Sequence, residues 1–366
     1  MNIHSVTSRK TTRLLGIDIA RSFAILGMVM VNYAVVMAPL ENATPSPLVY
    51  LEQFIQGKAA ALFVVLAGVG ASLGSRRARN AGAAEKRASQ VELRKRALFL
   101  YVVGWLFFFV WPADILHFYG IYLFVGSFFL FSSTRVLAWA SGLFALAGLI
   151  HLAAVDYFIN WNLDTLDYEG IFGLDGFVRS QLLNGFHPAI PWVAFYLAGI
   201  WFGRQDLHNM AVRRTILRAS LVVFMVGLII GWIGGEPATL ANPDPGAGFL
   251  LVPSILPPTP MYLVVGTSGA FAAITACLGW GDRIAVRNQT RIHPLVATGQ
   301  LALTLYIAHI VPGLAIIEIF TPLNGKTVDF AVVTAIVFFA ISVPLATMWR
   351  TTHQRGPLET LMRRIA

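Results

Sequence analysis

The sequence contains few charged residues and a single cysteine. Only 12% of its 366 residues are charged and 57% are hydrophobic, with a mean hydropathy of +0.68. Water-soluble domains carry about 25% charged residues, so this composition excludes a water-soluble domain with a single core. The one cysteine, Cys277, lies in an apolar stretch. Disulfide bonds within the chain and clusters of metal-binding thiolates are therefore excluded as well.

The sequence also lacks the motifs of common nucleotide-binding and metal-dependent enzymes. It contains no Gly-x-Gly-x-x-Gly, Walker sequence, His-Glu-x-x-His or nucleophile elbow. No predicted helix carries the closely spaced carboxylates and histidines of a metal centre, so we expect no metal site. The net charge of +9 is spread along predicted inner loops, where anionic lipid is a sufficient partner. We therefore expect no nucleic-acid partner.

Long hydrophobic runs dominate the sequence. A run of about 20 apolar residues predicts a helix that spans a bilayer. The sequence thus predicts an all-α, polytopic integral membrane protein with a transmembrane domain over residues 15–349. About ten spans are expected, two of them joined in a tight helical hairpin at residues 111–113. The predicted spans are 15–38, 54–74, 97–112, 115–131, 136–155, 188–203, 219–234, 261–280, 298–320 and 328–349.

The basic residues predict the orientation of these spans. Of the 27 lysines and arginines, 23 fall in segments that share one side if the N-terminal segment is cytoplasmic. Many of them lie in a predicted loop at 75–96. This bias places the N-terminal segment 1–14 and the tail 350–366 in the cytoplasm. The tail is expected to form an amphipathic helix that lies on the inner membrane surface.

The first predicted span contains two charged residues, Asp18 and Arg21, and a carboxamide, Asn32. An arginine near the bilayer centre costs about 3 kcal/mol on insertion scales, so such residues face a partner, a cavity or a substrate. Asp18 and Arg21 are three residues apart and therefore share one helix face. The pair is either a salt bridge that fixes helix packing or part of a polar site.

Three histidines are candidates for proton transfer. His117 follows Asp114 by three residues, a spacing that lets a carboxylate orient an imidazole. His187 precedes the sixth predicted span, and His309 lies inside the ninth. Their alternatives are structural: a histidine at the membrane surface can cap a helix or contact lipid headgroups.

Five segments of the chain are similar, in the same order, to segments of one family of bacterial membrane proteins. They are Arg13-Leu14 through Asn32, Gln56-Gly57-Lys58 through Gly70, Asp114-Ile115-Leu116 with Tyr119-Gly120, Thr298-Gly299-Gln300 through Tyr306, and Gly356-Pro357-Leu358-Glu359. The chain thus resembles the DUF418 (YeiB-like) family. The resemblance implies a multi-pass protein of the bacterial inner (plasma) membrane whose tail carries a Gly-Pro-Leu-Glu motif.

That family is related to the heparan-α-glucosaminide N-acetyltransferases and, more distantly, to the acyltransferase-3 enzymes. The relationship implies transfer of an acyl group from cytosolic acyl-CoA (acetyl-CoA). Acyltransferase-3 proteins carry a histidine eleven residues after the first-span arginine, where this chain has Asn32, and the N-acetyltransferase histidine is absent between residues 39 and 58. The base is therefore expected from His117, His187 or His309.

Two principal functions follow from these patterns. The first is a membrane acyltransferase that moves an acyl group from acyl-CoA to a sugar, an envelope glycan or another small acceptor. Arg21, Asp18 and Asn32, with Arg76 and Arg94, would then serve the donor path. The alternative is a transporter or exporter of a small polar or lipid-linked metabolite, with Asp18, Arg21, His309 and Glu318 as a relay. A structural membrane partner, including a homo-oligomer, is a third possibility.

Overall fold

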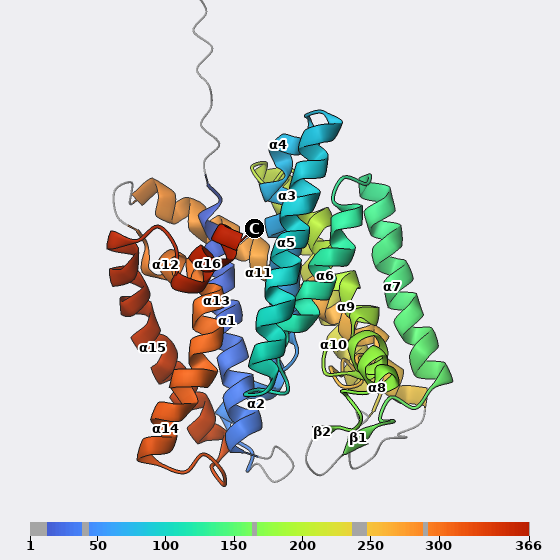
Figure 1. Ribbon diagram of the computed structural model, residues 1–366, viewed down its shortest axis with the longest axis vertical. Coiled ribbons are helices and arrows are strands. Elements are labelled where there is room, and N and C mark those ends of the chain that lie inside the picture. The colour runs from blue at the N-terminus through green and yellow to red at the C-terminus, as the bar shows by residue number, and fades with distance from the viewer. Residues whose placement is uncertain (1–12, 39–43, 163–166, 236–246, 288–291, 366) are drawn as a thin grey trace, which may run out of the picture.

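The computed structural model describes residues 13–38, 44–162, 167–235, 247–287 and 292–365. Over these residues the chain is almost entirely helical (Figure 1). The predicted all-α fold is therefore confirmed. The helices are α1 (Leu15–Met37), α2 (Pro47–Ile55), α3 (Lys58–Gly74), α4 (Arg76–Arg79), α5 (Ala83–Phe108), α6 (Leu116–Phe129), α7 (Thr134–Ala154), α8 (Leu174–Arg179), α9 (Ala189–Phe202), α10 (Met210–Ile233), α11 (Pro260–Arg287), α12 (Pro294–Gln300), α13 (Ala302–Ala308), α14 (Ala315–Phe320), α15 (Val328–Thr352) and α16 (Pro357–Ile365).

Shorter elements connect these helices. Strands β1 (Trp161–Asn162) and β2 (Asp167–Tyr168) pair in antiparallel register. Two segments are π-helical, η2 (Ser180–Asn184) and η4 (His309–Leu314), and η3 (Ala247–Leu251) is a 3-10 turn. Such π-helical segments are rare and are frequently found at functional sites.

Seven helical segments among the described residues are long and apolar enough to cross a membrane. Helices α6 and α9 are apolar but have only 14 residues each. At about 1.5 Å per residue they are shorter than a bilayer core of about 30 Å. The multi-pass architecture is thus supported, while the count of ten spans and the side of each terminus remain predictions. The segments are Leu15–Met37, Pro47–Gly74, Thr134–Ala154, Met210–Ile233, Pro260–Val286, Ala302–Phe320 and Val328–Thr352.

The prediction of a long loop at 75–96 is wrong. This stretch forms α4 and the first half of α5, which continues without a break to Phe108. Its residues are mostly good helix formers, and the charges that interrupt the apolar pattern do not interrupt the helix. Helices α5 and α6 then pack against each other as the expected hairpin. At Gly104 their backbones come so close that a Cβ atom would meet Leu116 and His117.

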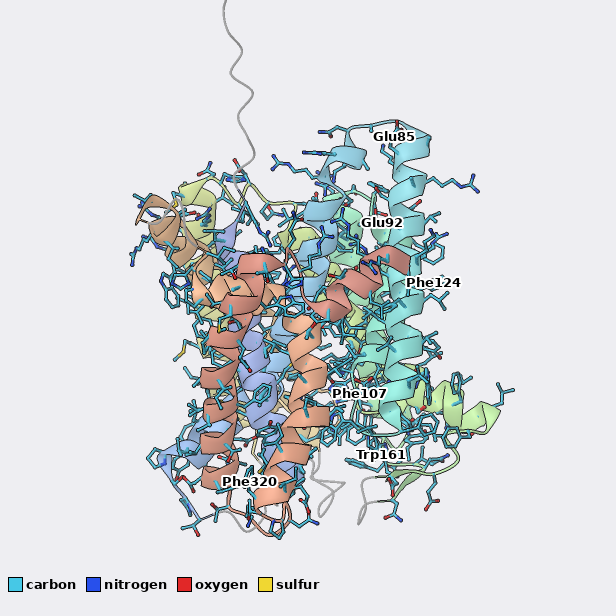
Figure 2. All side chains as sticks on the ribbon, turned by 60° about the vertical axis from the view of Figure 1, so that its left-hand side comes forward. Glu85, Glu92, Phe107, Phe124, Trp161 and Phe320 are labelled. Carbon is cyan, nitrogen blue, oxygen red and sulfur yellow. The ribbon has the colours of Figure 1, made fainter. Side chains whose placement is uncertain are left out.

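Different elements lie at the two ends of the described chain along its long axis. Figure 1 shows α4 and α16 toward one end and β1, β2 and α8 at the other. In Figure 2, Glu85 on α5 and Trp161 on β1 mark these two ends. We call them the α4 end and the hairpin end. Most of the predicted N-terminal segment 1–14 lies outside the described residues.

The outward faces of several helices are strongly apolar. Trp139 on α7 and Trp232 on α10 are more than four-fifths exposed. A contiguous apolar face of this kind is costly in water but matches the acyl chains of a bilayer. The polar residues discussed below are instead gathered inside the bundle.

Candidate functional site

Two cavities lie on either side of α6. The first, of about 450 Å³, opens toward the α4 end and is lined by five arginines; we call it the basic cavity. The second, of about 360 Å³, lies toward the hairpin end and is lined mainly by aromatic rings; we call it the aromatic cavity.

Helix α6 separates the two cavities because its side chains follow the helical period. Leu116, Tyr119 and Leu123 lie three and four residues apart and line the basic cavity. His117 and Phe118 point away from that face and line the aromatic cavity. The first turn of α6 therefore contributes to both sites.

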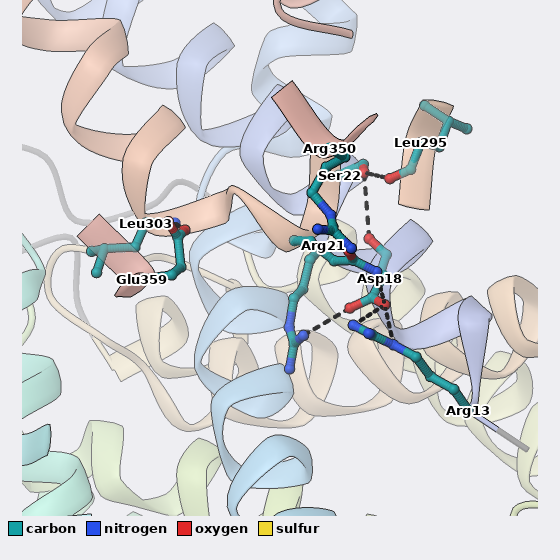
Figure 3. A network of polar contacts seen from close by, with 9 residues as sticks. Arg13, Asp18, Arg21, Ser22, Leu295, Leu303, Arg350 and Glu359 are labelled. Atoms are coloured by element: carbon teal, nitrogen blue, oxygen red, sulfur yellow. Dashed lines mark hydrogen bonds and ion pairs between the residues drawn. The ribbon is translucent and has the colours of Figure 1, made fainter. Parts of the chain in front are cut away.

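Asp18 organises the arginines at the rim of the basic cavity. Its carboxylate is almost fully buried and accepts hydrogen bonds from Arg13 Nε at 3.0 Å and Arg21 Nη1 at 2.9 Å. Gln300 Nε2 adds a third contact at 3.1 Å, and Arg350 Nε binds the Gln300 carbonyl oxygen. Figure 3 shows both arginines converging on Asp18. The predicted Asp18–Arg21 pair thus forms, and it holds Arg21 in the cavity wall.

The other three arginines of the basic cavity come from α5 and the C-terminal segment. They are Arg96, Arg355 and Arg363. Among the described lining residues Glu359 is the only acid, so the cavity is cationic even though Asp18 pairs with Arg13 and Arg21. A phosphate-bearing ligand is the natural counterpart of several guanidinium groups in one concave site.

Two tyrosines in the cavity lining have unsatisfied hydroxyl groups. The Oη atoms of Tyr119 and Tyr196 are buried and lack a hydrogen-bond partner among the described residues. Buried hydroxyls are normally paired, so each such exception calls for an explanation. A polar ligand atom in the cavity would supply the missing partner.

Asp114 holds His117 in one orientation, as the spacing predicts. Asp114 Oδ2 lies 3.1 Å from His117 Nδ1 and accepts the backbone N–H groups of Leu116 and His117. Its Oδ1 accepts the Tyr306 hydroxyl at 3.1 Å. Since a carboxylate only accepts, His117 carries its proton on Nδ1 and leaves Nε2 as a base.

His309 is paired with Asn32 rather than with a carboxylate. Asn32 Nδ2 lies 2.9 Å from His309 Nε2, and Tyr33 donates to the His309 carbonyl. The His309 Nδ1 atom is buried without a described partner. The Tyr306 and His309 rings lie 5.3 Å apart, so this pair adjoins the Asp114–His117 pair.

His187 lies in the segment before α9, close to both pairs. Its ring packs against Phe118 and Trp192. With Asn32 and Tyr306 it lines a small cavity of about 50 Å³. Desolvation by the surrounding side chains lowers the pKa of His187 to about 3, so the ring is neutral near pH 7. The structure therefore brings all three candidate histidines to one region of the bundle.

Of the five predicted donor residues, only Arg21 lines the basic cavity. Asp18 supports it from behind, and Asn32 lines the small cavity beside His187. Arg94 donates to Ser127 Oγ and stacks over the Phe128 ring, while Arg76 lies in α4, and neither lines the cavity. Arg96, which belongs to the same basic segment, does line the cavity from α5. The transporter relay is not assembled either, because Glu318 is exposed and binds the Leu323 backbone, away from His309.

The aromatic cavity combines aromatic rings from several parts of the fold. Its lining comes from the α5–α6 turn, the β1–β2 hairpin and η2, which are distant in the chain. The Gln181 amide is buried there without a hydrogen-bond partner among the described residues. Aromatic faces with a few polar groups are typical of pockets for small polar molecules. Among the residues that the structure describes, no group of three His, Cys, Asp or Glu side chains is placed to hold a metal ion.

Two family profiles together cover all the residues of this site. The family profile described as heparan-alpha-glucosaminide N-acetyltransferase, catalytic, matches residues 13–233, more than half of the chain. The chain belongs to this N-acetyltransferase family. The profile described as a protein of unknown function (DUF418) matches residues 201–366. Both parts of the resemblance seen in the sequence are thus confirmed. A search of curated proteins found no match.

The site joins the two matched regions. Asp114, His117 and Tyr119 lie within the N-acetyltransferase match, whereas Tyr306 and His309 lie within the DUF418 match. The Asp114–Tyr306 hydrogen bond therefore connects them directly. The three candidate histidines come from α6, η4 and the segment before α9.

Proposed function

We propose that the protein is a membrane acyltransferase that takes an acyl group from acyl-CoA, with acetyl-CoA as the donor that the family implies. The observation that carries the proposal is the basic cavity with its five arginines and two unpaired tyrosine hydroxyls. The arginines bind the phosphates of the donor, and the hydroxyls of Tyr119 and Tyr196 meet polar atoms of the pantetheine arm or the thioester. The acceptor, a sugar amine or hydroxyl, occupies the aromatic cavity.

Beside α6, a cluster of aromatic rings lies between the basic cavity and Asp114. Phe63 lies in the lining of the basic cavity and contacts Tyr119 and Tyr306, with centroid separations of 5.6 and 6.5 Å. Tyr306 in turn binds Asp114. In this proposal the thioester approaches His117 past Phe63 and Tyr306, whose side chains move aside.

The reaction follows from the orientation of His117. Its Nε2 accepts the proton of the acceptor N–H or O–H group while the acceptor atom attacks the thioester carbonyl carbon. A C–N or C–O bond forms, the C–S bond breaks, and the CoA thiolate leaves and takes up a proton. Asp114 stabilises the imidazolium formed during the attack.

Acetyl transfer by the purified full-length protein tests this function. The assay measures consumption of acetyl-CoA in detergent with glucosamine as acceptor, together with equilibrium binding of acetyl-CoA. Arg21→Gln should weaken donor binding by about tenfold, the value of one charge-assisted contact. Arg135→Gln, an exposed arginine outside the cavity, is the matched control. Absence of acetyl-CoA binding by the unaltered protein would contradict the proposal.

A further inference from the structure

The C-terminal segment folds back onto the bundle through Glu359. One carboxylate oxygen, Oε1, accepts the backbone N–H groups of Leu303 at 2.8 Å and Thr304 at 3.2 Å. The other, Oε2, accepts the Thr304 hydroxyl at 2.6 Å. The backbone N–H of Leu358 donates to the same hydroxyl oxygen at 3.3 Å. Glu359 thus accepts backbone N–H groups that the first turn of α13 leaves without a partner inside the helix. This turn follows the break in the helix at Leu301.

The glycine and proline of the Gly-Pro-Leu-Glu motif allow this contact to form. A Cβ atom on Gly356 would collide with the Glu359 carboxylate and lie 2.7 Å from Thr304 Oγ1. Pro357 occupies the first position of α16, where its missing N–H costs nothing. Trp349 Nε1 binds the Arg355 carbonyl at 2.8 Å and fixes the segment that precedes the motif.

Helix α16 is docked against the bundle, while its position relative to the membrane surface stays a prediction. It contacts both α5 and α13, which border the basic cavity. Met362 packs against the protein core and lines the cavity. Arg355 and Arg363 line it as well, and Arg363 is exposed to solvent.

We propose that α16 forms one wall of the donor site and that the hydrogen bonds of Glu359 hold this helix in place. Arg355, just before the helix, and Arg363 on it then bind the phosphate groups of the donor. This inference rests on the proposed function for the identity of the ligand. Glu359 is the one acid of the lining, yet its two oxygens are used by α13, so it acts as an anchor rather than as a repulsive charge.

The sign of the effect of Glu359→Gln separates these two roles. An anchor predicts that Glu359→Gln weakens CoA binding, although the substitution removes a negative charge from a site for an anion. A repulsive charge predicts tighter binding. We expect about tenfold weaker binding of CoA to the full-length protein, with faster amide hydrogen exchange over residues 357–365. Tighter or unchanged binding would overturn the proposal.

The two arginines, Arg355 just before α16 and Arg363 on it, are tested with a matched control on the same helix. Arg355→Gln and Arg363→Gln should each weaken CoA binding by about tenfold, whereas Arg364→Gln, next to Arg363 but outside the cavity lining, should leave it unchanged. Equal effects of Arg363→Gln and Arg364→Gln would overturn the role of α16 and leave the proposed function intact. If the unaltered protein binds no CoA, the proposed function itself fails, and this inference fails with it.

Discussion

Replacement of Asp114 by asparagine tests the proposed base most sharply. Asp114 is fully buried and accepts four hydrogen bonds, from two backbone N–H groups, His117 Nδ1 and the Tyr306 hydroxyl. Asparagine keeps the shape of the side chain and one acceptor oxygen, so His117 can keep its orientation. What Asp114→Asn removes is the negative charge beside the imidazole.

The size of the effect follows from the geometry. His117 Nδ1 and Asp114 Oδ2 are 3.1 Å apart, which places the charge centres of an imidazolium and a carboxylate about 4 Å apart. At an effective dielectric constant of about 20, this attraction is worth about 4 kcal/mol. Since each 1.36 kcal/mol is about tenfold in rate, kcat should fall about 10³-fold in Asp114→Asn.

The assay is turnover of acetyl-CoA with glucosamine by detergent-purified protein, and thermal unfolding of each variant confirms that it is folded. Tyr306→Phe is the matched control, because it removes one hydrogen bond to Asp114 but keeps the carboxylate charge. It should cost about tenfold, the value of a single hydrogen bond. A folded Asp114→Asn variant with turnover within tenfold of the unaltered protein would refute the assignment of His117 as the base.

Three further predictions follow from the described contacts. Asp18→Asn removes the charge that pairs with Arg13 and Arg21. Because both arginines are partly exposed, the free energy of unfolding should fall by only about 2 kcal/mol. An unchanged unfolding temperature would count against the network. Tyr119→Phe should leave thermal stability unchanged, since its hydroxyl has no described partner, but raise KM for acetyl-CoA several-fold; an unchanged KM would exclude the hydroxyl from donor binding. Burial lowers the pKa of His187 to about 3, below its ordinary value of about 6.5, so its contribution to stability is complete above about pH 6.5 and declines as the pH falls toward 3. His187→Gln should therefore make thermal unfolding less sensitive to acid between pH 6.5 and 5, and an equal sensitivity in both proteins would contradict this.

Local spacing predicted the contacts that lie within one helix turn. The three-residue separations of Asp18 from Arg21 and of Asp114 from His117 both give contacts in the structure. Hydrophobic run length likewise predicted an all-helical bundle and the approximate position of most helices. It failed at 75–96, because a charged segment was taken for a loop although its residues favour a helix.

Contacts between distant segments could not be predicted in this way. Tyr306 reaches Asp114 across 192 positions, and Asn32 reaches His309 across 277. No periodicity in one sequence encodes which helices adjoin. Tyr119 is an intermediate case, since the spacing of Leu116, Tyr119 and Leu123 shows a shared face, but only the fold shows that this face lines a cavity.

The central claim is that the basic cavity receives the CoA donor. A structure of the full-length protein determined with acetyl-CoA tests it most directly. The account predicts density for the phosphate groups among Arg21, Arg96, Arg355 and Arg363, with the thioester end within hydrogen-bond distance of the Tyr119 hydroxyl. Density for acetyl-CoA at any other place, or an empty basic cavity at saturating acetyl-CoA, would contradict the account.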